Sequence, residues 1–303
     1  KSDKNLDDDI RRQLTVLQRD VQDGSGALIS FDPYGAEQVT AALAYGDIMT
    51  ATDVSVIVPG MMSTTEQMKE WGGSARDLNR SVASHGGAGA TIVWFGYDSP
   101  NFAQEPGMHH AEYGGDALAT FLRGVDHFAS SADLAVIAHS YGSTTAAVAI
   151  GSDPHGLGVD QFITIGSAGL PTDDEILANL QSDTAPQIFA TQSGDDFWAP
   201  IGKLSSHSTS PLSLDGAIEF GSDGGVDEYG DPLLPTPGHD THTSGNFPGE
   251  HNPGGYLYEG SESFYNVQKI IATGEPGTEL GGEGSVDQFW DRVADAYANA
   301  PYY

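Results

Sequence analysis

The stretch at residues 133–143, Asp-Leu-Ala-Val-Ile-Ala-His-Ser-Tyr-Gly-Ser, constrains the fold of this chain most strongly. Its apolar first half predicts a buried strand, and the run at residues 144–150 predicts a helix directly after it. A Ser between strand and helix, with small residues two positions before and after, is typical of a sharp turn that lifts the Ser side chain above a sheet edge. Ala138 and Gly142 fill the small positions here, Ala138 in place of the more usual Gly, and Ser140 is the candidate nucleophile.

Two backbone N–H groups near this turn are candidates for holding a developing negative charge. The helix after Ser140 begins at Tyr141, so its unpaired N–H groups and the positive end of its dipole favour an anion there. A second apolar run at residues 54–58 ends in Pro59-Gly60-Met61 and precedes a predicted helix. Gly60 lets the chain turn, and we expect the N–H groups of Met61 and Tyr141 to form an oxyanion hole.

Strands and helices alternate through the rest of the chain. Such alternation predicts an α/β fold, a mainly parallel central sheet with helices on both faces, with any site at the carboxyl ends of its strands. An amphipathic helix at residues 7–22 precedes this unit, and no linker or repeat divides residues 1–303, which predicts a single domain. The further expected strands are 27–31, 39–44, 91–97, 161–165 and 187–191, and the further helices are 65–83, 115–128, 173–180, 263–272 and 285–300.

A carboxylate is needed to orient a catalytic His and to stabilise the imidazolium that forms. The strand at residues 187–191 runs into Gln-Ser-Gly-Asp-Asp, so Asp195 and Asp196 both qualify by position. Asp195 is preferred because it directly follows the turn at Gly194, and Asp196 is the alternative.

The His must follow in an irregular, Gly-, Ser-, Pro- and Asp-rich segment, about residues 203–255, which we interpret as a lid-like insertion. A His that serves a Ser nucleophile in this chain order is expected on the loop after the last strand and before a closing helix. His251 fits this rule best, and His242 is the alternative. His239 and His242 stand three residues apart, and we interpret them otherwise as loop or pocket-rim residues.

Charge and composition exclude several classes of function. Forty-three acidic residues against twelve basic ones give a formal charge of −31, which disfavours binding to phosphate backbones. The chain has no Cys, so it has neither disulfides nor thiolate chemistry. No apolar run reaches membrane-spanning length. The first residue is Lys rather than Met, so we expect a removed leader and a secreted protein.

No metal or cofactor is predicted. Asp223, Asp227, Glu228 and Asp231 resemble a calcium loop only in composition, because the EF-hand spacing is absent. His109 and His110 are neighbours in a polar loop before the helix at residues 115–128, and adjacent side chains point in different directions.

Several motifs in this order resemble one known family. They are residues 28–32, 54–61, 93–100, 138–143 and 165–169, with a closing segment at residues 251–274. Together they look like the largely actinobacterial α/β-hydrolase family long catalogued as a domain of unknown function. The resemblance implies an α/β-hydrolase fold with Ser140 as nucleophile, an acid matching Asp195 and a His matching His251. The chain departs from the family pattern at Ala138 and in an enlarged insertion before His251.

The pattern predicts a serine hydrolase that acts on small-molecule carboxylic esters or related acyl compounds through an acyl-Ser140 intermediate. The rival hypothesis is a ligand-binding module that keeps the fold without turnover. A third hypothesis, a calcium-dependent surface module, depends on the acidic residues 223–231. Ester, thioester, lactone and amide substrates all fit the same constellation of residues.

Overall fold

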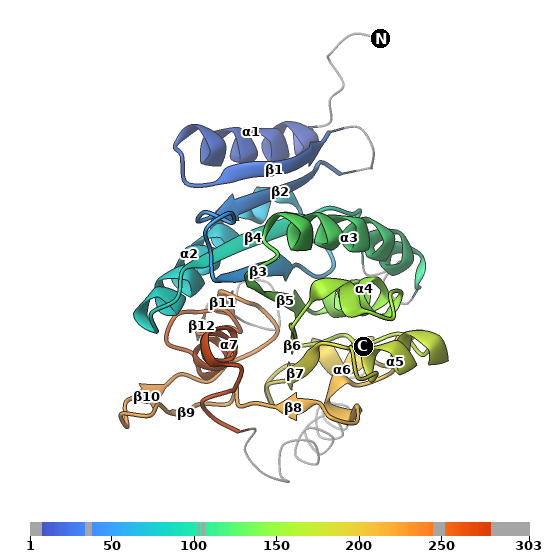
Figure 1. Cartoon of the computed structure of the whole chain (residues 1–303), viewed down its shortest axis with the longest axis vertical. Helices are drawn as coiled ribbons and strands as arrows, with labels where there is room; N and C mark the ends of the chain where they lie inside the picture. Colours follow the sequence, from blue (N-terminus) through green and yellow to red (C-terminus); the bar gives the residue numbers. More distant parts are fainter. Residues whose placement is uncertain (1–7, 34–37, 102–103, 105–106, 245–251, 280–303) are drawn as a thin grey trace, which may run out of the picture.

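The computed structural model describes residues 8–33, 38–101, 104, 107–244 and 252–279. Within them, an eight-stranded sheet has the order β1-β2-β4-β3-β5-β6-β7-β8 (Figure 1). β2 is antiparallel to both of its neighbours, and β3 to β8 pair in parallel. The predicted mainly parallel α/β sheet is therefore confirmed.

The strands have the following bounds: β1 (Ala27–Asp32), β2 (Thr40–Tyr45), β3 (Asp53–Val58), β4 (Gly89–Phe95), β5 (Asp133–His139), β6 (Gln161–Ile165), β7 (Gln187–Thr191) and β8 (Ile218–Glu219). The helices are α1 (Asp8–Gln22), α2 (Met68–Ser84), α3 (His109–Phe128), α4 (Tyr141–Gly151), α5 (Asp174–Leu180), α6 (Trp198–Gly202) and α7 (Glu262–Thr273).

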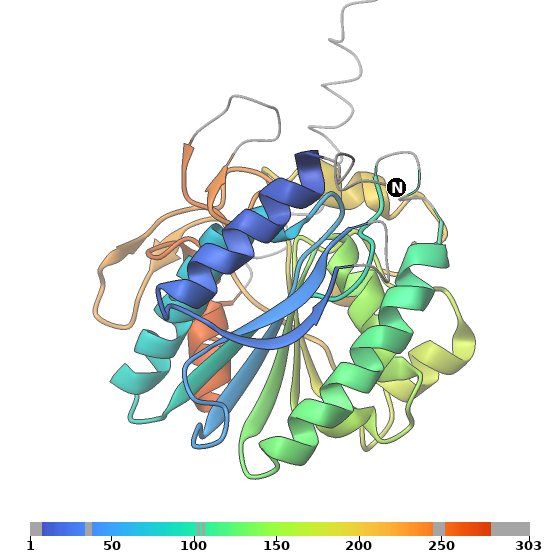
Figure 2. The ribbon, with the colours of Figure 1, turned by 90° about the horizontal axis from the view of Figure 1, so that it is seen from above.

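Helices cover both faces of the sheet, as Figure 2 shows in the view from above. One apolar cluster joins the sheet to α3, α4 and α5, and a second joins it to α1, α2 and α7. Side chains alternate along each central strand: Val56 belongs to the first cluster and Ile57 to the second. This period of two, with apolar residues on both sides, is what a doubly covered parallel strand requires.

The parallel register brings four strand ends to one edge of the sheet. Val58 pairs with Ala138, His139 pairs with Ile165, and Ile165 pairs with Thr191. The loops that leave these strands therefore start side by side, although they are far apart in the sequence. They carry the residues of the candidate site.

Two helical predictions differ from the structure or lie outside it. Residues 109–114 were expected in a loop, but α3 begins at His109. Ala111, Gly114 and Gly115 are buried in α3. An added Cβ would stand 2.7 Å from the Tyr97 ring at Gly114 and 2.5 Å from Val148 of α4 at Gly115. Close packing of small residues thus extends the helix past two glycines. The helix predicted at residues 285–300 lies outside the described residues.

The segment after α6 forms short strands. Its strand β8 extends the main sheet, and β9 (Gly225–Val226) and β10 (Pro232–Leu233) form a short hairpin. Further along, β11 (Thr243–Ser244) pairs with β12 (Asn252–Pro253). The lid-like role expected for residues 203–255 stays a prediction. In the part of the chain described here, every helix is too short or too polar to cross a bilayer.

Candidate active site

Ser140 stands on a strained turn between β5 and α4. Its backbone has φ 54° and ψ −129°, a region that non-glycine residues rarely enter. Gly142 makes this turn possible, because a Cβ there would lie 2.3 Å from the carbonyl oxygen of Val58. Ala138 is fully buried within β5, where a methyl group fits, so this departure from Gly leaves the turn intact. The predicted strand, turn and helix around Ser140 are confirmed.

The loop after β3 passes directly against Ser140. A Cβ on Gly60 would lie 2.6 Å from Cβ and 3.2 Å from Oγ of Ser140, so only glycine allows this approach. Met61 follows Gly60, and Tyr141 is the first residue of α4. Both backbone positions therefore adjoin Ser140, as the predicted oxyanion hole requires, and their action as donors stays a prediction.

His239 contacts both Ser140 and a buried carboxylate. Its Nε2 lies 2.8 Å from Oγ of Ser140, and its Nδ1 lies 2.9 Å from each carboxylate oxygen of Asp196. Because a carboxylate only accepts, Nδ1 carries the proton and Nε2 is left to accept from the Ser140 hydroxyl. Ser140 and Asp196 follow the ends of β5 and β7, and His239 lies on the segment between β10 and β11. Their chain order is Ser, Asp, His.

Asp196 is fully buried and receives four donors. Besides His239, the hydroxyl of Tyr256 donates to Oδ2 at 2.8 Å, and the N–H groups of Trp198 and Ala199 donate to Oδ1 at 3.0 Å. These donors replace the water that the carboxylate loses on burial. No sequence pattern indicated the role of Tyr256, which follows Gly254 and Gly255 and is itself fully buried.

The preference for Asp195 over Asp196 was wrong on geometry. The N–H of Asp196 donates to the carbonyl of Ser193 at 3.1 Å, which closes a tight turn through Gly194 and Asp195. The turn leaves Asp195 exposed at its tip and sends Asp196 inward. Two adjacent Asp residues cannot be told apart by strand position alone, because the turn type decides which one points to the sheet.

The position next to Ser140 belongs to His239, a residue that the sequence pattern assigned to a loop or the pocket rim. His251 lies outside the described residues. His242 contacts Ser74 through Nε2 at 2.7 Å and Thr241 through Nδ1 at 2.8 Å, with its ring against Trp71. The sequence analysis chose the candidate His by its nearness to the closing helix, and this criterion does not select His239. The β11–β12 hairpin separates His239 from α7, so the active-site candidate comes earlier in the chain.

Electrostatics distinguish His239 from His139 and His242. Burial lowers the pKa of His239, but the charge of Asp196 and its hydrogen bond, with a contribution from Asp240, outweigh burial and raise the pKa above its ordinary 6.5. Burial lowers the pKa of His139 to about 3 and that of His242 to about 4. For Asp196, burial raises the pKa, yet His239 and the other donors outweigh it and lower the pKa.

The raised pKa of His239 predicts how activity depends on pH. A general base must be neutral, so activity should fall as the pH drops through the raised pKa of His239. We expect the acid limb of kcat/KM for an ester to have its midpoint above 6.5. The measurement is a pH profile from 5 to 9 at constant ionic strength, with unfolding followed across the same range. A midpoint well below 6.5 in folded protein would contradict His239 as the base.

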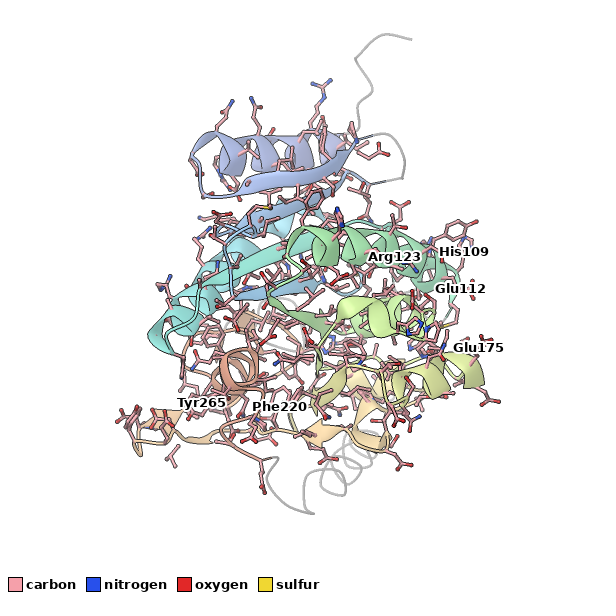
Figure 3. The ribbon with its side chains drawn as sticks, in the orientation of Figure 1. His109, Glu112, Arg123, Glu175, Phe220 and Tyr265 are labelled. Carbon is pink, nitrogen blue, oxygen red and sulfur yellow. The ribbon has the colours of Figure 1, made fainter. Side chains whose placement is uncertain are left out.

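The other side chains considered as ligands are engaged elsewhere. His109, labelled in Figure 3, is the exposed first residue of α3. Its ring contacts that of Tyr113. In the acidic segment, Asp227 accepts from the N–H groups of Tyr229 and Asp231, and Glu228 pairs with Lys269. Among the described residues, His, Asp and Glu side chains nowhere gather in threes that could hold a metal ion.

Comparison with known proteins defines the class to which this fold belongs. A family model described as alpha/beta hydrolase matches residues 32–206, more than half of the chain, and the chain belongs to this family. Two proteins named as uncharacterized, Rv2079 and MT2140 of Mycobacterium tuberculosis strains H37Rv and CDC 1551, are each 34% identical to it over 158 residues. The match covers 47% of this chain but only 23% of either relative. The narrower actinobacterial family stays a prediction.

Solved structures of α/β serine hydrolases are also similar to this chain. XC6422 from Xanthomonas campestris, described as an α/β serine hydrolase without lid, has 14% identity and a TM-score of 0.38, covering 64% of this chain and 83% of its own. An α/β serine hydrolase homologue from Coxiella burnetii has 13% identity and a TM-score of 0.38, covering 65% and 87%. The family match, with the strand order and the turn at Ser140, establishes the α/β-hydrolase fold.

Proposed function

We propose that this hydrolase-family protein cleaves carboxylic esters or related acyl compounds through a covalent acyl-Ser140 intermediate. The observation that carries the proposal is the unbroken hydrogen-bonded series from Ser140 Oγ through His239 to Asp196, built on the strained backbone at Ser140. A nucleophile, a base within hydrogen-bonding reach and a carboxylate that orients the base are the parts that acyl transfer needs.

In this mechanism His239 takes the Ser140 proton as Oγ attacks the carbonyl carbon of the ester. The N–H groups of Met61 and Tyr141 hold the oxyanion, each contributing on the order of 3 kcal/mol when well placed. Protonated His239 then gives its proton to the leaving alkoxide. After that, His239 activates a water molecule, which releases the acid and restores Ser140. Asp196 stabilises the imidazolium throughout without taking its proton.

Several features favour an ester as the substrate class. An alkoxide leaves more readily than an amine, so an ester needs less assistance than an amide from the same set of groups. The charge of −31 disfavours polyanionic substrates such as nucleic acids. Because this chain spans only 23% of its curated relatives, the proposal concerns the hydrolase unit itself. Secretion of the protein stays a prediction.

Labelling with a fluorophosphonate tests the proposal directly. We expect the intact mass of the wild-type chain to increase by a single adduct, which peptide mapping places on Ser140, whereas Ser140→Ala should give none. The experiment is run at moderate and high salt, because the acidic surface repels itself less when screened. Absence of an adduct in folded wild-type protein at both salts would refute the acyl-Ser140 mechanism and favour the ligand-binding module.

A further inference from the structure

His139 is a buried histidine in contact with the candidate base. It ends β5, directly before Ser140, and its side chain is almost fully buried. Its Nε2 lies 2.7 Å from the backbone carbonyl oxygen of His239, and the two imidazole rings are 4.8 Å apart between centroids. The mechanism above gives His139 no part in proton transfer, so this contact needs its own explanation.

The protonation state of His139 is defined by its partner. A backbone carbonyl only accepts, so Nε2 of His139 carries a proton and donates it to His239. Burial, with a smaller effect of the neighbouring His239 ring, lowers the pKa of His139 to about 3, although the bond to the His239 carbonyl and the charge of Asp196 act in the opposite direction. His139 is therefore neutral wherever a His base works. A charged ring here would also repel the imidazolium of His239.

The segment that carries His239 has no helix or strand of its own, so its position depends on individual contacts. On one side, Ser193 Oγ donates to the carbonyl of Thr236 at 2.5 Å. On the other, the N–H groups of Tyr256 and Leu257 donate to the carbonyls of Asp240 and Thr241 at 3.2 and 2.8 Å. These bonds hold the loop at both ends but do not reach the backbone of His239.

The bond from His139 acts at the residue that bears the base. β5 lies in the middle of the sheet, paired on both sides by parallel strands, so its last residue is held firmly. The same strand end carries Ser140. β5 thus holds Ser140 through its backbone and holds His239 through the side chain of His139. The position of the base relative to the nucleophile therefore depends on this one strand.

We propose that His139 is a positioning residue that sets the place of His239 through its Nε2–H bond to the backbone carbonyl. The proposal rests on the proposed function, since it assigns a role around the same base. Reactive groups need placement to well within an ångström, and a displacement of about 1 Å can reduce the rate about 100-fold. Loss of the bond should therefore reduce turnover while leaving substrate binding nearly intact.

The test compares His139→Leu with His139→Gln. Leu removes the donor but fills part of the buried space, whereas the terminal amide of Gln can place an N–H close to the position of Nε2. We expect His139→Leu to lower kcat for ester hydrolysis about 10- to 100-fold, with KM within about twofold, and to slow fluorophosphonate labelling by a similar factor. His139→Gln should recover most of both rates.

A spectroscopic readout separates positioning from packing. The proton between His239 Nδ1 and Asp196 should give a low-field NMR signal, absent in His239→Ala, that broadens or shifts in His139→Leu and returns in His139→Gln. Full rates in His139→Leu, or a loss that His139→Gln does not restore in folded protein, would overturn the proposal. If His139→Leu fails to fold, His139→Asn, whose amide is too short to reach the carbonyl, takes its place.

The two proposals can fail separately. A wild-type chain that neither labels nor hydrolyses esters would refute the proposed function. The NMR comparison still applies to that chain, because it reports the geometry of His239 and Asp196 without turnover. An unchanged signal in folded His139→Leu would refute the positioning role even where the wild type is active.

Discussion

Replacing His239 by Ala should lower kcat for ester hydrolysis by about 10⁵- to 10⁶-fold, because loss of the base disables the nucleophile as completely as loss of Ser140 would. The side chain is the sole link between Ser140 and Asp196 in the hydrogen bonds of the described residues. The measurement is steady-state hydrolysis of a short-chain p-nitrophenyl ester by His239→Ala and Ser140→Ala. Thermal unfolding confirms that both variants are folded.

Two further histidines provide matched controls for this prediction. His242→Ala removes a side chain bonded to Ser74 and Thr241, so it should affect stability more than chemistry and change kcat less than about tenfold. His251→Ala tests the residue that the sequence pattern favoured. If His251→Ala loses all turnover while His239→Ala keeps it, the assignment of His239 is wrong and the sequence-based choice is restored.

Replacing Asp196 by Asn should lower kcat about 10⁴-fold, because Asn can donate to Nδ1 and so stabilise the wrong tautomer of the base. In that tautomer Nε2 carries the proton and cannot accept one from Ser140. The loss should therefore appear in kcat at every pH above the acid limb, with KM changed little. Kinetics of the purified variant over pH 6 to 9 measure it.

Asp195→Asn is the control at the neighbouring position. Asp195 is exposed at the turn tip, so its substitution should leave kcat within about twofold of wild type. Unfolding temperatures accompany both variants, because Asp196 also receives the N–H groups of Trp198 and Ala199 at the start of α6. Equal losses in the two variants, or a loss in Asp195→Asn alone, would contradict the role of Asp196.

The sequence predicted those parts of the site that depend on local structure. Residues 133–150 determine their own strand, turn and helix, because apolar alternation and small residues at Ala138 and Gly142 act within a few positions. Parallel pairing then brings the ends of β3, β5, β6 and β7 together. Ser140 and the neighbouring Gly60 could be found for this reason.

The acid and the base depend on contacts that no local pattern encodes. Asp196 points inward because of a turn closed at Ser193, and the same sequence with another turn type would send Asp195 inward instead. His239 reaches Ser140 from 99 residues away, on a loop without regular structure. Its only local signal is the preceding Pro237-Gly238 pair, which is common in loops. Long-range hydrogen bonds, rather than periodicity, decide such positions.

The backbone conformation at Ser140 also places stability and activity in conflict. A residue held at φ 54° and ψ −129° costs on the order of 1 to 3 kcal/mol of folding free energy that Gly would largely avoid. The strained backbone therefore lowers the stability of the fold at the proposed nucleophile. Selection for heat tolerance alone would favour replacing Ser140, so a library screened only for survival on heating should drift toward inactive variants unless turnover is selected as well.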